Sequence, residues 1–375
     1  MTNISISEIN SYLRCRRAWD LTSASRQSLR HKITPKIFFV IGSAVHEAID
    51  AQASGGDPLE AFEAYVEKER TERIDFYYET TKHSPSEAEM REFEESVELA
   101  RGLVNQYFTE YGWENPLEER GLKYVATEVP FSIPIGTGLN FVGTFDGIAT
   151  DIATESQFYL IENKTASQKP NIAMIQSSNQ FVGYNWAFRT LTGQTLSGTL
   201  YNGIIKRIIK EPRVLKTGAL STDKSAGVTF RSFMAKMMRG GHDPVKYLDY
   251  LEYLQEREIN GDDRFFVRDM LTFTNVQLDN WYEQVLKPIS YEMWAQSPGV
   301  QSESSDLAIY PNFTSCDKCL VKDICDAMQL GEDVEAVKEL RYEVKTYGTM
   351  EAVANVTPTV IASVSDLLET LNGQS

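Results

Sequence analysis

Residues 140–149 read NFVGTFDGIA, and residues 157–164 read QFYLIENK. Both runs are rich in β-branched and aromatic residues and lie between turn signals, which predicts two strands. Glu162 and Lys164 are two residues apart on the second strand, so their side chains point to the same face. Asp146 ends the first strand and can lie beside them. Two carboxylates and a lysine offer oxygen ligands for Mg²⁺ or Mn²⁺ and a cation that stabilises charge on a phosphate.

Further elements surround this pair of strands. Residues 123–131 predict a preceding strand, and 134–138 predict the turn that follows it. A helix is expected from about 170 to 191, and then a fourth strand over 197–209. Three strands, a helix and a further strand indicate an α/β core.

Helices are expected on both sides of this core. Residues 5–13 combine a hydroxyl N-cap with apolar residues at helical spacing. A second helix is expected to start after Gly42, and residues 59–111 predict a long helical insertion that breaks near 83–85. Helices are also expected over 232–258 and 275–293, with a short extended piece at 264–268 between them.

Three more polar residues are candidates for the same site. Gln180 and Tyr184 are four residues apart and therefore share one helix face. They can reach a metal or a nucleotide together, although an amide and a phenol at a core boundary are also common. His46 can complete a mainly oxygen-based metal site, since imidazole suits Mn²⁺. A lone histidine is more often structural.

Charge is distributed unevenly along the 375 residues, whose formal net charge is −16. Residues 57–120 hold 18 acidic and 7 basic residues, whereas residues 1–40 hold 7 basic and 2 acidic ones. Residues 205–240 carry 9 basic residues, which include Lys206, Arg207, Lys210 and Arg213. Two cationic segments suit a polyanion, although each alone is compatible with an ordinary solvated surface. No long apolar run or secretory signal is seen, so the cytoplasm is the expected compartment.

The chain has four cysteines, and they lie at its two ends: Cys15 near the N-terminus, and Cys316, Cys319 and Cys325 in a C-x2-C-x5-C cluster. Four cysteines are too few for a disulfide framework in a chain of this length, and C-x2-C favours metal binding. We therefore expect a four-thiolate site that joins the two ends. The residues alone leave zinc and an iron–sulfur cluster open, because both accept four thiolates.

The order of these motifs resembles the RecB-type branch of the PD-(D/E)XK nucleases. The resemblance rests on His46, Gly143-x-x-Asp146, Glu162-x-Lys164 and Gln180-x-x-x-Tyr184, and it spans roughly residues 5–325. Phe145 stands where the family name has proline, which is usual in this branch. The cysteine pattern, with Ser7 and Tyr12 before Cys15, is similar to the iron–sulfur subset that includes AddB-type and CRISPR-associated RecB-like exonucleases.

The resemblance implies a restriction-endonuclease-like core, with a mixed central sheet flanked by helices, a helical insertion and a cysteine clasp. It also implies a role for each matching residue. His46, Asp146, Glu162 and the Asn163 carbonyl would hold Mg²⁺ or Mn²⁺, and Lys164 would position or activate the attacking water. Gln180 and Tyr184 would shape the DNA channel. The four cysteines would hold a [4Fe–4S] cluster.

Arg268, in the short extended piece, is a weaker candidate for a phosphate contact. Lys206, Arg207, Lys210 and Arg213 are expected to supply further DNA contacts.

These expectations divide the chain into five parts: an N-terminal helical segment (1–56), an acidic helical insertion (57–120), the nuclease core (121–230), a C-terminal helical region (231–330) and an acidic tail (331–375). The favoured function is a metal-dependent DNA exonuclease on single strands or DNA ends, in recombination, repair or processing. One alternative is a DNA-end-binding module of a helicase or recombination complex that cleaves little. A zinc-stapled structural protein would require all the core motifs to be coincidence.

Overall fold

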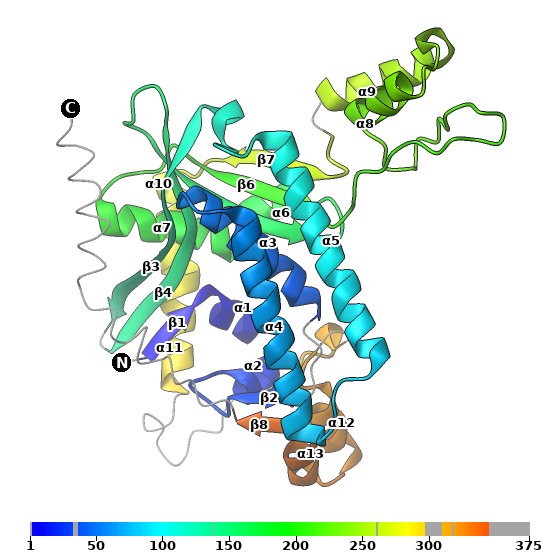
Figure 1. The fold of residues 1–375 in the computed structure, drawn as a ribbon. Coiled ribbons are helices and arrows are strands. Elements are labelled where there is room, and N and C mark those ends of the chain that lie inside the picture. Colours follow the sequence, from blue (N-terminus) through cyan, green and yellow to red (C-terminus); the bar gives the residue numbers. More distant parts are fainter. Residues whose placement is uncertain are drawn as a thin grey trace.

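A mixed central sheet forms the middle layer of the protein, as Figure 1 shows for the computed structural model. The structure describes residues 2–32, 37–136, 138–259, 262–296, 310–316 and 319–344. Six strands make the sheet: β1 (Thr2–Ser5), β3 (Leu122–Gly136), β4 (Leu139–Asp151), β5 (Phe158–Ala166), β6 (Gly198–Ile205) and β7 (Phe266–Leu271).

The strand order is β1-β4-β5-β6-β7, and β3 pairs with β4. The pairs β3–β4, β4–β5 and β6–β7 are antiparallel, whereas β5–β6 and β1–β4 are parallel. A parallel pair needs a crossover connection, and two helices between β5 and β6 provide it. The expected α/β core with a mixed sheet is confirmed.

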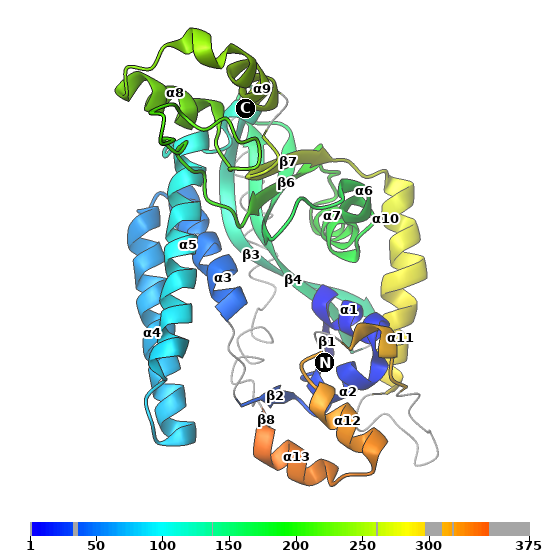
Figure 2. The same ribbon diagram turned by 90° about the vertical axis from the view of Figure 1, so that its right-hand side faces the viewer.

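Helices cover both faces of this sheet (Figure 2). One face carries α3 (Ile37–Ala53), α4 (Pro58–Thr81) and α5 (Glu87–Tyr111). The other carries α1 (Ile6–Arg14), α6 (Ile172–Gln176), α7 (Asn179–Thr192), α10 (Asn275–Trp281) and α11 (Lys287–Ala295), with a short π-helical segment at Tyr282–Leu286. No helix among the described residues is long and apolar enough to cross a bilayer.

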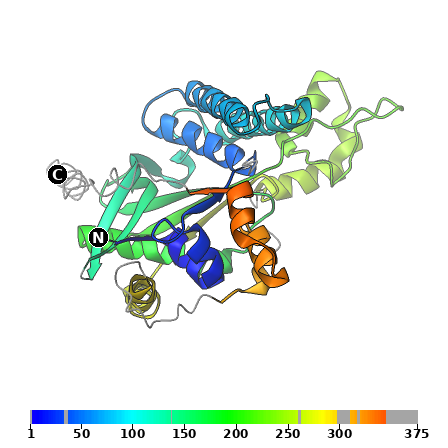
Figure 3. The ribbon, with the colours of Figure 1, turned by 90° about the horizontal axis from the view of Figure 1, so that it is seen from below.

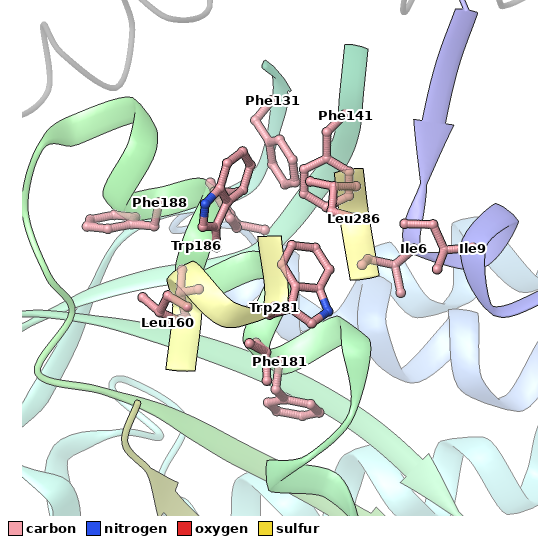
Figure 4. Close-up of a cluster of buried hydrophobic side chains, with 14 of the residues drawn as sticks. Ile6, Ile9, Phe131, Phe141, Leu160, Phe181, Trp186, Phe188, Trp281 and Leu286 are labelled. Atoms are coloured by element: carbon pink, nitrogen blue, oxygen red, sulfur yellow. The ribbon is translucent and has the colours of Figure 1, made fainter. Parts of the chain in front are cut away.

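The largest hydrophobic core lies between the sheet and the α7 side. Ile6 and Ile9 of α1 pack there with Phe181 of α7 and Trp281 of α10 (Figure 4). Ser5 caps α1 through its hydroxyl, which accepts the Glu8 amide at 3.3 Å. The sequence-based expectation of a hydroxyl-capped N-terminal helix is confirmed.

The acidic insertion is a helical hairpin made by α4 and α5. Ser86 and Glu89 form a capping box at the start of α5, which stabilises the new helix after the break that the sequence predicts. The hairpin packs on α3, and Ile204 of β6 joins the same buried cluster. Its remaining faces stay polar, so its acidic charge does not enter the core.

One helix begins earlier than expected. α3 starts at Ile37, so Gly42 lies inside the helix and does not precede it. A Cβ on Gly42 would come 3.2 Å from the Thr165 hydroxyl of β5. Glycine here allows the helix to approach the catalytic strand closely, which outweighs its poor helix propensity.

Residues between β6 and β7 form a separate arm that projects from the sheet (Figure 1). It contains α8 (Phe230–Arg239), a 3₁₀ turn at Pro244–Tyr247 and α9 (Leu248–Ile259). The arm has a small core of its own around Phe233, Met237 and Tyr250.

The N-terminal segment and the last described segment of the chain, through Val344, meet below the sheet. The C-terminal helices α12 (Lys322–Leu330) and α13 (Val334–Arg341) lie beside α1 and α2 (Arg16–Thr22), as Figure 3 shows from below. A two-stranded sheet pairs β2 (Leu29–His31) with β8 (Tyr342–Val344). The first part of the expected acidic tail, through Val344, is thus joined to the N-terminal segment.

Candidate active site

The strands β4 and β5, which carry Asp146 and Glu162, separate at the site. Pairing between β4 and β5 runs from Gly147 opposite Ile161 toward the turn. Beyond Gly147, the Asp146 side chain and not the β4 backbone binds to β5. Its carboxylate Oδ2 accepts a hydrogen bond from the backbone amide of Asn163 at 3.0 Å. The carboxylate is thereby held beside β5, close to Glu162 and Lys164.

Two glycines let aromatic rings close around Asp146. A Cβ on Gly143 would lie 2.6 Å from Phe131 Cζ and 3.2 Å from Tyr184 Cε1. A Cβ on Gly147 would lie 2.6 Å from Tyr124 Cε1. A Cβ at either position would therefore force a neighbouring aromatic ring to move. The close packing of these rings explains the two glycines of the Gly-x-x-Asp-Gly sequence.

Buried Glu162 forms an ion pair with Lys164, whose side chain is half-buried. Lys164 Nζ contacts Glu162 Oε1 and lies 3.9 Å from Asp146 Oδ2. Burial raises the pKa of Glu162 to about 7, although the Lys164 charge acts in the opposite direction. Burial lowers the pKa of Lys164, but Glu162 and Asp146 outweigh that effect and raise it above its ordinary value. Lys164 is therefore held as a cation at this position.

Three further ligand atoms meet next to this pair. His46 of α3, Glu128 of β3 and Asp146 of β4 each offer one, and these atoms lie within 4.8 Å of one another. Among the described residues this is the group that can hold a metal ion. The pKa of His46 is lowered by burial, against the pull of the Asp146 charge. A neutral imidazole is the form that binds metals.

Glu128 is absent from the sequence-based prediction. Its φ of 46° is in the left-handed region, which is unusual for a residue with a side chain in a strand. Desolvation, together with the Asp146, Asp50 and Glu47 carboxylates, raises its pKa to about 7. The sequence nevertheless contains a signal for the position of Glu128. Glu128 and Asp146 each lie nine residues from position 137, which is inside the expected turn, so a hairpin centred there places them opposite each other. Pairing of Thr127 with Gly147 and of Val129 with Phe145 sets them side by side.

A cavity of about 590 Å³ opens beside His46 and Glu128, two of these three ligand groups. Its lining includes His46, Glu128, Lys206 and the acidic residues Glu47 and Asp50. Three carboxylates against one lysine make this wall unfavourable for a phosphate unless a cation is bound there. The cavity therefore combines the features of a cation site with room for a ligand.

Gln180 lies where the sequence predicts, and Tyr184 lies behind the site. Gln180 Nε2 donates to Glu162 Oε1, the same oxygen that Lys164 contacts, and so helps to fix the carboxylate. Tyr184 packs edge-on against Phe131 and Phe145. Burial raises the pKa of its phenol.

Arg268 is a correction to the sequence-based prediction. Its side chain is only 3% exposed, and its guanidinium donates to Asn202 Oδ1 (2.8 Å), Tyr107 Oη (2.9 Å) and Glu119 Oε1 (3.0 Å). It also lies over the Tyr111 ring at 3.3 Å. These partners come from the acidic insertion and the sheet, so Arg268 is an interior structural residue and cannot contact a phosphate in this conformation.

This buried network reaches the site. Asn202 Nδ2 donates to Asn163 Oδ1 at 2.7 Å, and the Asn163 amide in turn binds Asp146. Asn202 and Asn163 are opposite each other in the parallel β5–β6 pair. A chain of hydrogen bonds through Asn202 and Asn163 therefore connects Arg268 with Asp146.

The basic residues after β6 differ in position. Lys206 lines the cavity and is half-buried, which lowers its pKa. Arg207 donates to the Ser225 carbonyl at 2.7 Å and is bound within the arm. Lys210 and Arg213 are exposed, and their expected DNA contacts stay predictions.

The four cysteines gather where the chain ends meet. Cys15 Sγ accepts the Asn312 amide at 3.3 Å, and Cys316 Sγ lies 3.8 Å from the Asn312 carbonyl. Cys15 and Cys319 pack on one hydrophobic cluster with Val321 and Ile324. Burial raises the pKa of Cys319 and of Cys325. The neighbouring thiols, with Cys15 among them in both cases, raise these pKa values further. Among the described residues, no three of these thiols have ligand atoms as close together as those of His46, Glu128 and Asp146, so the Cys₄ site stays a prediction, with zinc and iron–sulfur both open.

Comparisons with known proteins agree with this geometry. The family model of the PD-(D/E)XK nuclease superfamily matches residues 3–326, which include all the residues of the cavity and the four cysteines. A search of curated proteins gave no match.

Proposed function

Because the chain belongs to the PD-(D/E)XK nuclease superfamily, whose members are metal-dependent nucleases, we propose that it is a DNA exonuclease of the RecB-type branch. The observation that supports this most is the convergence of Asp146 with His46 and Glu128 on one side, and with Lys164 and its partner Glu162 on the other. The substrate would be single-stranded DNA or DNA ends. The setting would be recombination, repair or DNA processing, together with a helicase or recombination protein.

The donor set fits Mg²⁺ or Mn²⁺. His46, Glu128 and Asp146 would bind the ion directly, with Glu162 and the Asn163 carbonyl as further ligands. Carboxylate and carbonyl oxygens suit both ions, and the imidazole favours Mn²⁺. When bound, such an ion lowers the pKa of a coordinated water and neutralises charge on the phosphate.

The side chains around the ion have separate tasks. Lys164, held as a cation between Glu162 and Asp146, orients the attacking water and stabilises negative charge that develops on the phosphate. Gln180 keeps Glu162 in place by donating to it. Lys206, on the cavity wall, offers a positive charge to a phosphate that enters.

The strand would reach the cavity along the basic surface after β6. Lys210 and Arg213 are exposed there, and Tyr184 shapes the wall behind the site. Arg207 contributes less than expected to this path, since its guanidinium is bound to Ser225.

The cysteine site would hold a [4Fe–4S] cluster that clasps the chain ends. Its support is the one-plus-three cysteine distribution, which is typical of the iron–sulfur nucleases and unusual for zinc ribbons. Protein prepared without oxygen should be brown and contain iron and acid-labile sulfide. Colourless protein with stoichiometric zinc would refute the iron–sulfur assignment and leave the nuclease assignment intact.

The proposed activity is tested with end-labelled DNA. Linear single strands, linear duplexes and circular single strands are incubated with Mg²⁺, with Mn²⁺ or with EDTA. We expect metal-dependent release of short products from linear DNA and little cleavage of circles. Equal cleavage of circles would contradict the exonuclease assignment, and no cleavage of any substrate would contradict the nuclease assignment.

A further inference from the structure

A second cavity, of about 550 Å³, opens on the clasp side of the molecule. It lies between the end of α1 and residues 310–314. Its lining holds Arg14 and Arg16 and no acidic residue, whereas the wall of the active-site cavity holds three carboxylates. Both charged residues of the lining are thus cationic, and Arg14 adds its charge to an Arg16 that is paired with Glu292, which favours an anionic ligand over a cation here.

Large aromatic side chains stand open at this cavity. Tyr310 is 56% exposed and Phe313 is 60% exposed. The Arg16 guanidinium lies 5.1 Å from the centroid of the Tyr310 ring and is oriented by a 2.9 Å ion pair with Glu292. Open aromatic rings beside arginines are the combination with which proteins bind unpaired bases and their phosphates.

The cavity is preformed. Asn312 Nδ2 donates to the Arg14 carbonyl at 2.8 Å, and the Arg17 amide binds the Tyr310 carbonyl at 3.4 Å. The aromatic segment is thus attached to α1 and α2. Cys15 is the one cysteine in the lining, so this cavity borders the group of thiols.

Side-chain hydrogen bonds connect helix α1, which lines this cavity, to the active site. Asn10 Oδ1 of α1 accepts a hydrogen bond from Asn179 Nδ2 of α7 at 2.8 Å. The next residue, Gln180, donates to Glu162. From Asn10 to Arg14 the helix rises about 6 Å, so the second cavity begins roughly one helical turn along α1 from the residue that contacts α7.

We propose that this cavity is a second binding site for single-stranded nucleic acid. An unpaired base stacks on Tyr310 or Phe313, and the neighbouring phosphates lie near Arg14 and Arg16. The inference rests on the proposed function, because the strand bound here is the one whose end lies in the active-site cavity. The site would favour strands long enough to span both cavities.

The test measures binding without cleavage. Fluorescent single strands of about 4 and about 16 nucleotides, a length range typical of single-strand sites, are titrated in EDTA with wild type, Tyr310→Ala, Phe313→Ala and Arg14→Ala. We expect each aromatic variant to bind the long strand about 5- to 150-fold more weakly, which corresponds to one lost stacking contact. Binding of the short strand should change little.

Tyr78→Ala is the matched control, because Tyr78 is a 63% exposed tyrosine on the acidic insertion. It should bind both strands like wild type. A blunt duplex of the same length should lose little affinity in any variant, since its bases cannot stack on the protein. An equal loss for duplex and single strand would overturn the assignment to unpaired bases.

Failure of this inference is distinguishable from failure of the proposed function. If both aromatic variants bind the long strand like wild type, the second site is refuted even when wild type cleaves DNA. If wild type does not cleave with any metal but the aromatic variants still lose affinity, the second site stands and the nuclease assignment falls.

Discussion

Glu128 is the residue whose role the structure adds to the site. It lies with His46 and Asp146 as a third ligand group. We expect Glu128→Ala to lower Mn²⁺ affinity by at least about 10-fold, since even second-shell changes at metal sites cost 10- to 100-fold. Manganese binding is measured by calorimetry or electron paramagnetic resonance.

Glu47→Ala is the control for this prediction. Glu47 lines the same cavity but does not belong to the group of three, so its loss should change Mn²⁺ affinity much less. Wild-type affinity in the Glu128 variant, or an equal loss in both variants, would show that the ligand set is different.

Arg268 is the second residue with a revised role. Arg268→Ala removes the guanidinium donor that Asn202 Oδ1 accepts from in the interior, so we expect unfolding free energy to fall by about 2–4 kcal/mol. Urea unfolding measures this. Arg231→Ala, at an arginine that is 63% exposed, should change it by about 0.5 kcal/mol or less.

A phosphate-contact role for Arg268 predicts the opposite outcome. A stable Arg268→Ala protein with weakened DNA binding would restore the sequence-based expectation. Arg268→Lys should be nearly as destabilising as alanine, because an ammonium cannot reproduce a fork that contacts Asn202, Tyr107 and Glu119 together.

At the scale of elements, the catalytic strands could be predicted and their surroundings could not. The strands that carry Asp146 and Glu162 have local signals, namely β-branched runs between turns, and the structure has them as β4 and β5. The pairing of β1 with β4 and the early start of α3 depend on tertiary packing, which periodicity does not report. The predicted phosphate contact of Arg268 was wrong for the same reason. The sequence around an arginine in a strand does not show whether its partners are phosphates or buried tyrosines.

The site was partly predictable for a related reason. Asp146, Glu162 and Lys164 are close in sequence and lie on adjacent strands, so local spacing indicates their convergence. Glu128 reaches the site through the register of a long hairpin, and its left-handed backbone has no sequence signature of its own. Its position could have been found only by counting outward from the turn.

The proposed cysteine clasp would link the N-terminal segment to α12, and this leads to a stability prediction. Cys316→Ala should lower unfolding free energy and melting temperature strongly, because the four cysteines lie beside the hydrophobic cluster through which α12 and β8 pack on the N-terminal segment. The folded fraction should still cleave DNA at close to the wild-type rate per molecule, as measured by active-site titration. A fully stable variant without bound metal or cluster would show that the clasp does not hold the ends.

At the scale of the whole molecule, much of the negative charge is concentrated in the acidic insertion. A negative net charge is therefore compatible with DNA binding elsewhere on the surface. The acidic insertion has ion pairs such as Arg101 with Glu63, and it lies on the α3 face of the sheet. Much of the arm's positive charge is also paired, as Lys236 and Arg239 are with Glu211. The net charge of −16 therefore says little about the surface that a strand would meet.

Salt dependence measures how many charges bind the strand. Lys210→Ala and Arg213→Ala should each reduce the slope of log affinity against log salt by about 0.7, the value for one phosphate contact on a single strand. Lys236→Ala is the control, since Lys236 is engaged with Glu211 at 2.9 Å. Unchanged slopes in the first two variants would place the DNA path elsewhere.

The central claim is that Lys164 acts on the reacting groups within a metal-dependent nuclease site. Single-turnover cleavage of end-labelled single-stranded DNA by wild type and Lys164→Ala, with binding measured in parallel, tests it most directly. We expect the variant to lose cleavage and to keep nearly wild-type DNA affinity, because the ligand groups and the basic surface remain. Cleavage by Lys164→Ala at the wild-type rate, with contaminating nuclease excluded by an Asp146→Ala preparation, would contradict the claim.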